Sequence, residues 1–240
     1  MKTKFAFFEK IKKVPWWVWL CGIASLLVQS LFYYLSNFLT GIAQRAPICT
    51  KIDWLDDALP IIPIFAIVYV YAFVFWFCAP ASAYVAGKDN FYKFIIGQSV
   101  AYFIGFIIFV CLPTYMDRSA EGILAYAEER NLWLLKTIYN MDGGKMAFNL
   151  FPSYHCLTSV YSYLAVRKQK NVSLVYRIYA LCLAILVCIA TLAIKQHYFL
   201  DFICGTGIAI VTYIVVNLVY NKIKKDKGNG KNLQFNQHER

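Results

Sequence analysis

The chain has 240 residues, of which 24 are basic and 13 acidic, so its formal net charge is +11 at pH 7. Hydrophobic residues make up 60% of the sequence and charged residues only 15%, and the mean hydropathy is +0.52. This composition excludes an ordinary soluble domain and predicts an integral membrane protein.

Six uncharged intervals predict six transmembrane helices, because a spanning helix needs roughly 20 apolar residues. These intervals cover residues 14–44, 58–87, 94–116, 146–166, 178–194 and 202–221. The first has no small-residue cleavage site and is expected to remain as an anchor. The expected fold is all-α, with one six-helix membrane domain over 14–221. A basic cytosolic N-terminus over 1–13 and a basic, disordered cytosolic tail over 222–240 flank it.

The segment between the third and fourth intervals mixes aliphatic and acidic residues over positions 119–139. This pattern predicts an interfacial helix, which either covers a site as a lid or is a solvated connector. The stretch Asp142-Gly143-Gly144 then predicts a turn into the fourth span.

The positive charge is unevenly distributed between the two sides of the predicted bundle. Six spans place both termini on one side, together with the loops near Lys88 and Arg167, and that side holds 17 of the 24 basic residues but only four acids. Basic flanks stay in the cytoplasm, so both termini are expected on the cytoplasmic side of the cell membrane. The charge therefore indicates topology and contact with anionic lipids, and we expect no nucleic-acid partner.

The same topology places Arg118, His155, His197 and Asp201 together at the extracytoplasmic face. If the sixth helix begins near Lys195, His197 and Asp201 are four residues apart on one helical face. The carboxylate can then hold one imidazole nitrogen and leave the other free to act as a base or nucleophile. The alternative is that the pair of His197 and Asp201 has only a structural role at a helix end.

Three further residues have the chemistry to hold phosphate oxygens. Ser153 follows Pro152 at an expected helix start, where its hydroxyl and backbone N–H can face an anion. Arg118 can hold two oxygens with its guanidinium fork, or can simply snorkel to the interface. Lys195 is a second candidate cation if the local turn is non-helical. The cysteine spacing predicts neither a metal site nor a disulfide framework.

The order of these motifs is recognisable. An arginine motif, then Pro-Ser-x-His, then His-x-x-x-Asp across six spans resembles the type 2 phosphatidic acid phosphatase (PAP2) superfamily over about residues 59–220. The stretches Asn149-Leu150-Phe151-Pro152-Ser153-Tyr154-His155 and Lys195-Gln196-His197-Tyr198-Phe199-Leu200-Asp201 are similar to the branch containing inositol phosphorylceramide and sphingomyelin synthases.

The resemblance implies a mechanism that needs no metal or other cofactor. His197 would attack the phosphorus and form a phosphohistidine, and Asp201 would orient it. His155 would protonate the departing alkoxide, and Arg118 and Ser153 would hold the phosphoryl oxygens. Positioning and charge neutralisation supply most of the rate in such reactions.

The chain departs from the broad superfamily pattern at four positions. Cys111 replaces the lysine and Ser119 the proline of the first motif, Tyr154 replaces a glycine of the second, and Thr191 replaces the arginine of the third. Two of the usual cations are therefore absent, unless Lys195 substitutes for one of them.

Three functions remain open from the sequence. The first is a phosphatase that hydrolyses a lipid phosphate, such as phosphatidic acid or a polyprenyl phosphate, at the extracytoplasmic face. The second is a transferase that passes a phospholipid headgroup to a lipid alcohol. The third is a non-catalytic lipid-binding or transport protein that has kept the fold. In each case the expected partners are a lipid phosphate and the surrounding membrane lipids.

Overall fold

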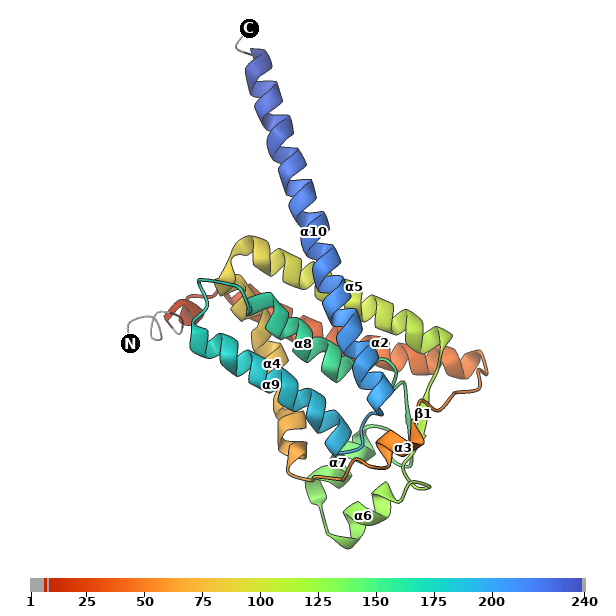
Figure 1. Ribbon diagram of the computed structural model, residues 1–240. Coiled ribbons are helices and arrows are strands. Elements are labelled where there is room, and N and C mark those ends of the chain that lie inside the picture. The colour runs from red at the N-terminus through yellow and green to blue at the C-terminus, as the bar shows by residue number, and fades with distance from the viewer. Residues whose placement is uncertain (1–6, 8, 239–240) are drawn as a thin grey trace.

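The protein is a helical bundle with a small two-stranded ribbon at one end (Figure 1). A computed structural model describes residue 7 and residues 9–238, with side chains described up to residue 227. The elements are α2 (Trp16–Ile42), α3 (Asp53–Asp56), α4 (Phe65–Ala86), α5 (Lys88–Cys111), β1 (Tyr115–Asp117), α6 (Ile123–Glu129), α7 (Trp133–Met141), β2 (Met146–Phe148), α8 (Tyr154–Val166), α9 (Leu174–Ala193) and α10 (Phe199–His238).

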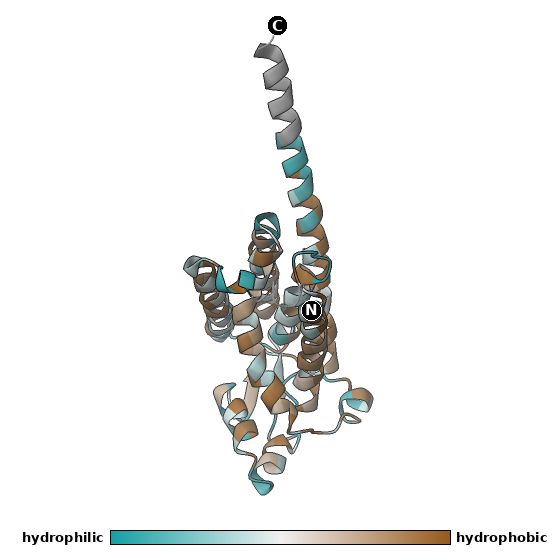
Figure 2. Ribbon diagram, turned by 90° about the vertical axis from the view of Figure 1, so that its left-hand side faces the viewer, coloured by the Kyte–Doolittle hydropathy of each residue, from teal (hydrophilic) through white to brown (hydrophobic). Residues whose placement is uncertain are grey.

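Among the described residues, five helices are long and apolar enough to cross a membrane: α2, α4, α5, α9 and α10. Hydrophobic residues dominate these helices, and polar residues gather at their ends and along the projecting part of α10 (Figure 2). The prediction of a predominantly helical chain is therefore confirmed, and these five helices support a membrane protein, but the count of six spans is not confirmed. The fourth predicted span contains α8, which has only 13 residues and is about 20 Å long.

Helix α8 is short because the residues before it form a strand and a helix cap. The first residues of the predicted span, Met146–Phe148, form β2 and pair antiparallel with β1. Helix α8 then begins only after Ser153, whose hydroxyl accepts the backbone N–H of Cys156. The charge pattern of the sequence gives no sign of these strands, in which backbone groups between the helices find hydrogen-bond partners.

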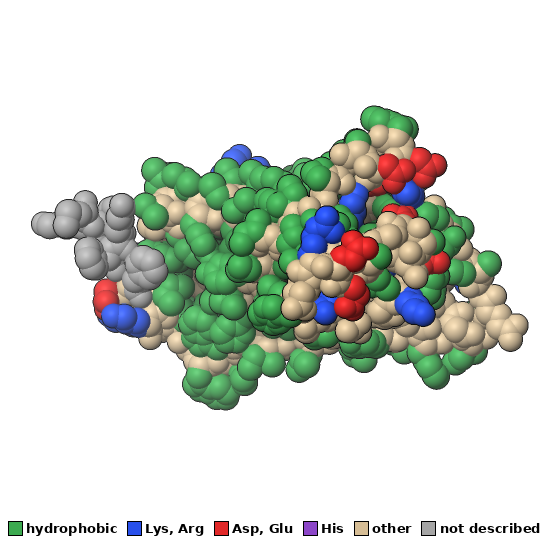
Figure 3. All heavy atoms as spheres, turned by 90° about the horizontal axis from the view of Figure 1, so that it is seen from below, with side chains coloured by type: hydrophobic (Ala, Val, Ile, Leu, Met, Phe, Trp, Pro, Cys, Tyr) green, Lys and Arg blue, Asp and Glu red, His purple; other side chains and the backbone are tan. Residues whose placement is uncertain are grey.

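The segment expected to be one interfacial helix over 119–139 forms two short helices, α6 and α7. They are separated at Asn131, which adopts a φ of +49°. With α3 they form the cap at one end of the molecule, where acidic and basic side chains lie close together (Figure 3). One such pair joins Lys136 to Glu128 at 3.1 Å.

Helix α10 also differs from expectation. Its backbone continues as a helix to His238, through most of the segment 222–240 that the sequence analysis expected to be disordered. Adding residues to an existing helix costs far less than nucleating a new one, so a helix that spans the membrane can continue into a polar tail. Residues 239–240 lie outside the described residues.

At two helix glycines the backbone of another segment approaches closely and shapes the interior. Gly22 of α2 packs on α4, where an added Cβ would lie 2.3 Å from the carbonyl oxygen of Phe77. Gly205 of α10 packs on the start of α8, where an added Cβ would lie 2.3 Å from the carbonyl oxygen of Ser153. The backbone N–H of Ser153 also donates to the carbonyl oxygen of Asp201 at 3.0 Å. The two motif segments are thereby joined through their backbones.

We predict that Gly205→Ala destabilises the protein by about 1–3 kcal/mol, because the new methyl group meets backbone that cannot rotate away. The matched control is Gly207→Ala on the same helix, where an added Cβ meets nothing within 4 Å. Unfolding of both variants in detergent measures the difference. Equal stability of the two variants would contradict the close approach.

Candidate functional site

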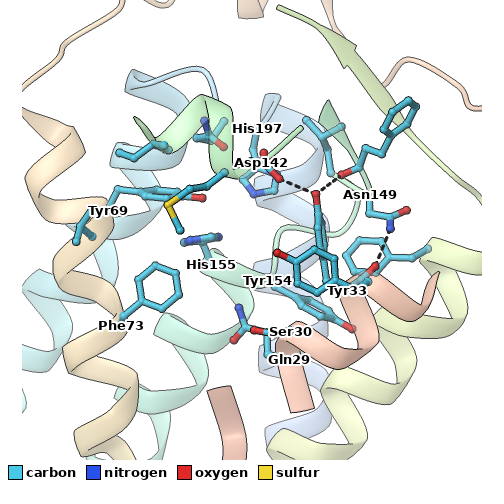
Figure 4. A pocket seen from close by; sticks show the side chains of 18 of the residues that line it. Gln29, Ser30, Tyr33, Tyr69, Phe73, Asp142, Asn149, Tyr154, His155 and His197 are labelled. Atoms are coloured by element: carbon cyan, nitrogen blue, oxygen red, sulfur yellow. Dashed lines mark hydrogen bonds between the residues drawn. The ribbon is translucent and has the colours of Figure 1, made fainter. Parts of the chain in front are cut away.

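The structure brings His155 and His197 together from segments far apart in the sequence. His155 lies in the first turn of α8, and His197 lies in the linker between α9 and α10. Their ring centroids are 6.0 Å apart, and both side chains line the same cavity (Figure 4). The two imidazoles are therefore close enough to contact one phosphate group.

The orientation of His155 is set by aromatic packing against α4. Its ring stacks on Tyr69 with centroids 4.1 Å apart and an interplanar angle of 18°. Phe73 and Trp76 make T-shaped contacts with the same ring, with centroid distances of 5.8 and 4.9 Å. The Trp76 indole is itself held by a hydrogen bond to Ser159. The buried Nε2 of His155 has no hydrogen-bond partner among the described residues.

His197 is paired with Asp201, although not on one helical face as expected. Helix α10 begins at Phe199, so His197 precedes it. Asp201 is the third residue of the helix, and its Oδ2 accepts the backbone N–H of Tyr198 at 2.8 Å, as the third residue of a capping box does. This geometry turns the carboxylate back toward His197 Nδ1, which lies 3.6 Å from Oδ2. Thr50 donates to Oδ1 at 2.7 Å and completes the environment of the carboxylate.

The pKa of His197 reflects two opposing effects. Burial disfavours the imidazolium and lowers the pKa, but the attraction of Asp201, with smaller contributions from Cys156 and Asp142, raises it by more. The net result is a pKa above the ordinary value. The neutral imidazole, which a nucleophile must present, therefore forms only as the pH rises through this elevated value.

Arg118 is fully buried, and both terminal nitrogens of its guanidinium already have partners, whereas its Nε has none among the described residues. Nη2 contacts the Asp142 carboxylate at 2.6 Å and the Gln196 side-chain oxygen at 3.1 Å. Nη1 donates to the carbonyl oxygens of Asp142 and Gly144 at 2.8 and 3.2 Å. The arginine expected to hold phosphate thus holds the α7–β2 turn, and it is Asp142 and Gln196 that reach the cavity.

The other two residues predicted to bind phosphate also point elsewhere. Lys195 does sit in a non-helical turn, with a φ of +51°, but its ammonium group donates to the carbonyl oxygen of Asp56, and burial lowers its pKa. Ser153 uses its hydroxyl to cap α8 and its backbone N–H to bind Asp201. Neither residue lines the cavity with the histidines.

The cavity has a volume of about 600 Å³ and lies between α2, α4 and the segment that leads into α8. Most of its lining is apolar or aromatic. Its polar lining residues are Gln29, Ser30, Asp142, Asn149, His155, Gln196 and His197, together with the tyrosines Tyr33, Tyr34, Tyr69 and Tyr154. Three of these residues carry a buried atom without a hydrogen-bond partner in the described chain, namely His155 Nε2, Asn149 Oδ1 and Gln196 Nε2, whereas the unpartnered Nδ1 of His197 faces Asp201. Buried polar atoms are normally paired, so this cluster indicates a site for a polar ligand.

Several lining residues were missed by the sequence analysis, above all those of α2. The Tyr33 hydroxyl donates to Asp142 at 2.6 Å, and the Asn149 amide donates to Ser36 and Asn37 at 2.7 Å each. The available signal was the presence of amide and hydroxyl side chains inside an otherwise apolar span, since polar residues at membrane depth commonly mark functional sites.

We predict that Asp201→Asn lowers the pKa of His197, because the carboxylate attraction is lost while the effect of burial remains. The chain has three histidines, so NMR titration of isotope-labelled histidine resolves each ring, and His238→Gln identifies the signal of the tail. An unchanged pKa for His197 in Asp201→Asn would show that the carboxylate does not act on the ring.

One known protein family matches most of the chain. The sequence profile of the PAP2 superfamily matches residues 47–215, more than two thirds of the chain. The matched region includes both cavity histidines and Asp201, whereas α2 precedes it. No curated protein and no solved structure matches the chain. The chain belongs to the PAP2 superfamily.

Proposed function

We propose that this protein is a membrane enzyme that hydrolyses a lipid phosphate, with His155 and His197 as its catalytic residues. Membership of the PAP2 superfamily supports phosphatase-type activity on lipid phosphates. The observation that carries the proposal is the pair of imidazoles, 6.0 Å apart, on one cavity lined by unpartnered polar atoms. The charge distribution of the loops supports an extracytoplasmic position for this site.

The shape of the cavity suits a substrate that carries hydrocarbon chains. Helices α2 and α4 are in contact at Gly22. The cavity lies away from this contact, beside Tyr33 of α2 and Tyr69 of α4. Several lining side chains on these two helices, such as Val70 and Val74, are also exposed on the outer surface of the bundle, at 44% and 50%. The surface of a spanning helix faces lipid, so a lipid tail can lie between α2 and α4 while its phosphate reaches the histidines.

The proposed reaction has two steps. In the first, the Nε2 of His197 attacks the phosphorus and the bond from phosphorus to the lipid oxygen breaks. The departing alkoxide takes a proton from His155, which the negative charge of the bound phosphate keeps protonated against the effect of burial. In the second, neutral His155 takes a proton from water, the water oxygen attacks the phosphorus, and the N–P bond breaks to release phosphate. Asp201 holds Nδ1 and stabilises the charge on His197 during attack.

The charge of the cavity requires one further step on binding. The carboxylate of Asp142 repels an incoming phosphate and occupies the Arg118 fork. We propose that the substrate phosphate takes the place of this carboxylate at Arg118. The turn that carries Asp142 continues through Gly143 and Gly144, both with positive φ.

The same cavity supports a second candidate reaction. Gln196 is 2% exposed, and the His197 side chain is 10% exposed, so the site gives water little access. A lipid alcohol that reaches the phosphohistidine between α2 and α4 then competes with water. The product is a new phospholipid, as in the synthase branch that the motif stretches resemble.

We predict that His197→Ala lowers phosphate release from detergent-solubilised phosphatidic acid or undecaprenyl phosphate by about a thousandfold or more, because the nucleophile is lost. His238→Ala, in the tail, is the matched control and is expected to retain wild-type activity. Equal phosphate release by His197→Ala and the wild type would exclude catalysis at this site and favour a non-catalytic lipid-binding protein.

We predict that Asp142→Asn lowers the KM for a lipid phosphate by about five- to tenfold, because a negative charge leaves the cavity. Asparagine retains an oxygen for Arg118, and the melting temperature of the variant shows whether the buried arginine remains satisfied. An unchanged or higher KM in a stable variant would contradict competition between the carboxylate and the substrate phosphate.

The hydrolase and the transferase are separated by offering labelled diacylglycerol together with a phospholipid donor. Mass spectrometry of the products then distinguishes them. A phosphatase yields only free phosphate and a dephosphorylated lipid, whereas a transferase yields a labelled phospholipid.

A further inference from the structure

Gln29 places a carboxamide at the end of the cavity that lies beneath His155 in Figure 4. The residue belongs to the membrane-spanning helix α2, is 8% exposed, and is surrounded mainly by apolar side chains. A carboxamide at this depth is costly unless it is paired. The proposed reaction gives Gln29 no part.

Hydrogen bonds from two other helices fix the orientation of this amide. Its oxygen accepts the hydroxyl of Tyr102 from α5 at 3.1 Å and that of Thr158 from α8 at 3.3 Å. The Tyr102 oxygen in turn accepts the amide of Gln98 at 3.0 Å, and the Gln98 oxygen accepts the hydroxyl of Ser25. With its oxygen held in this way, Gln29 has only its NH2 group to offer the cavity. That group has no hydrogen-bond partner in the part of the chain that the structure describes.

The position of the Gln29 amide relative to His155, measured along the axis of α8, follows from its contact with Thr158. Thr158, which holds the Gln29 oxygen, follows His155 by three residues, which is about 4.5 Å along the helix axis. The amide donor therefore lies roughly one helical turn below the catalytic imidazole, on the side away from the α6–α7 cap.

Lipid phosphates differ in the chemistry they present at this depth. In a glycerolipid or sphingolipid phosphate, an acyl carbonyl follows within a few bonds of the phosphoester oxygen, as an ester in one and an amide in the other. A polyprenyl phosphate has only hydrocarbon there. With the phosphate at His197, a donor one turn below meets a carbonyl oxygen in the first class and no acceptor in the second.

We propose that Gln29 determines specificity by donating a hydrogen bond to the acyl carbonyl of a glycerolipid or sphingolipid phosphate, so that polyprenyl phosphates are poor substrates. This inference rests on the proposed function, because it takes the phosphate to lie at the histidines. A substrate without the carbonyl leaves the amide unpaired in an apolar cavity, which reduces kcat/KM by about five- to tenfold.

The test compares dioleoyl phosphatidic acid with its dialkyl ether analogue, which differs only in lacking the carbonyls. We expect the wild type to prefer the diacyl lipid by about five- to tenfold in kcat/KM, and Gln29→Met to bring this ratio close to one. Thr212→Val, at a buried hydroxyl in α10 that does not line the cavity, is the control and keeps the wild-type ratio. Ceramide 1-phosphate distinguishes an amide from an ester carbonyl, and undecaprenyl phosphate is expected to gain relative to both in Gln29→Met.

Phosphate release with equal rates on diacyl and dialkyl lipids, or a ratio that Gln29→Met leaves unchanged, would overturn the role of Gln29 while leaving the proposed function intact. Absence of phosphate release from every lipid by the wild type would instead overturn the proposed function. In that case, thermal stabilisation by diacyl and dialkyl phosphonates still decides the role of Gln29, since equal stabilisation contradicts it. If Gln29→Met does not fold, Gln29→Asn draws the amide back by one methylene and is expected to weaken the same preference.

Discussion

The arrangement of the site depends on the contacts of one buried residue, Asp201. Its side chain accepts the backbone N–H that opens α10 and the hydroxyl of Thr50, and its carboxylate faces His197. Its carbonyl oxygen accepts the N–H of Ser153, directly before α8. A buried carboxylate needs such partners to be tolerated. Because these partners come from separate segments, pairing them also sets His155 and His197 side by side.

A second buried charge, Arg118, organises the part of the cavity beside His197. Arg118 is held by the Asp142 carboxylate, by backbone carbonyls of the same turn and by Gln196. This ion pair joins β1 to the α7–β2 turn, and Tyr33 extends it to α2. Truncation of Asp142 to a residue without a side-chain oxygen would leave the fully buried Arg118 without this partner, which is strongly destabilising. The proposed substrate phosphate resolves this constraint, because it offers Arg118 another anion when Asp142 leaves.

Much of the fold could be predicted from the sequence because the membrane restricts its solutions. Uncharged intervals identified the regions of α2, α4, α5, α9 and α10, and the topology inferred from them placed the two histidines at one end of the bundle. The shortness of α8 could not be predicted in this way, since charge counts ignore the β1–β2 pairing that uses the first residues of its interval. The engagement of Arg118 was equally hidden, because Asp142 appeared in the sequence only as part of a turn.

The central claim is that one phosphate group lies between the two imidazoles. A structure of the protein with bound orthovanadate, which mimics a phosphoryl group under attack, tests it most directly. The account predicts vanadium bonded to the Nε2 of His197, with a vanadate oxygen in hydrogen-bond contact with His155. Vanadate bound elsewhere, or bound near Arg118 without contact to either histidine, would contradict it.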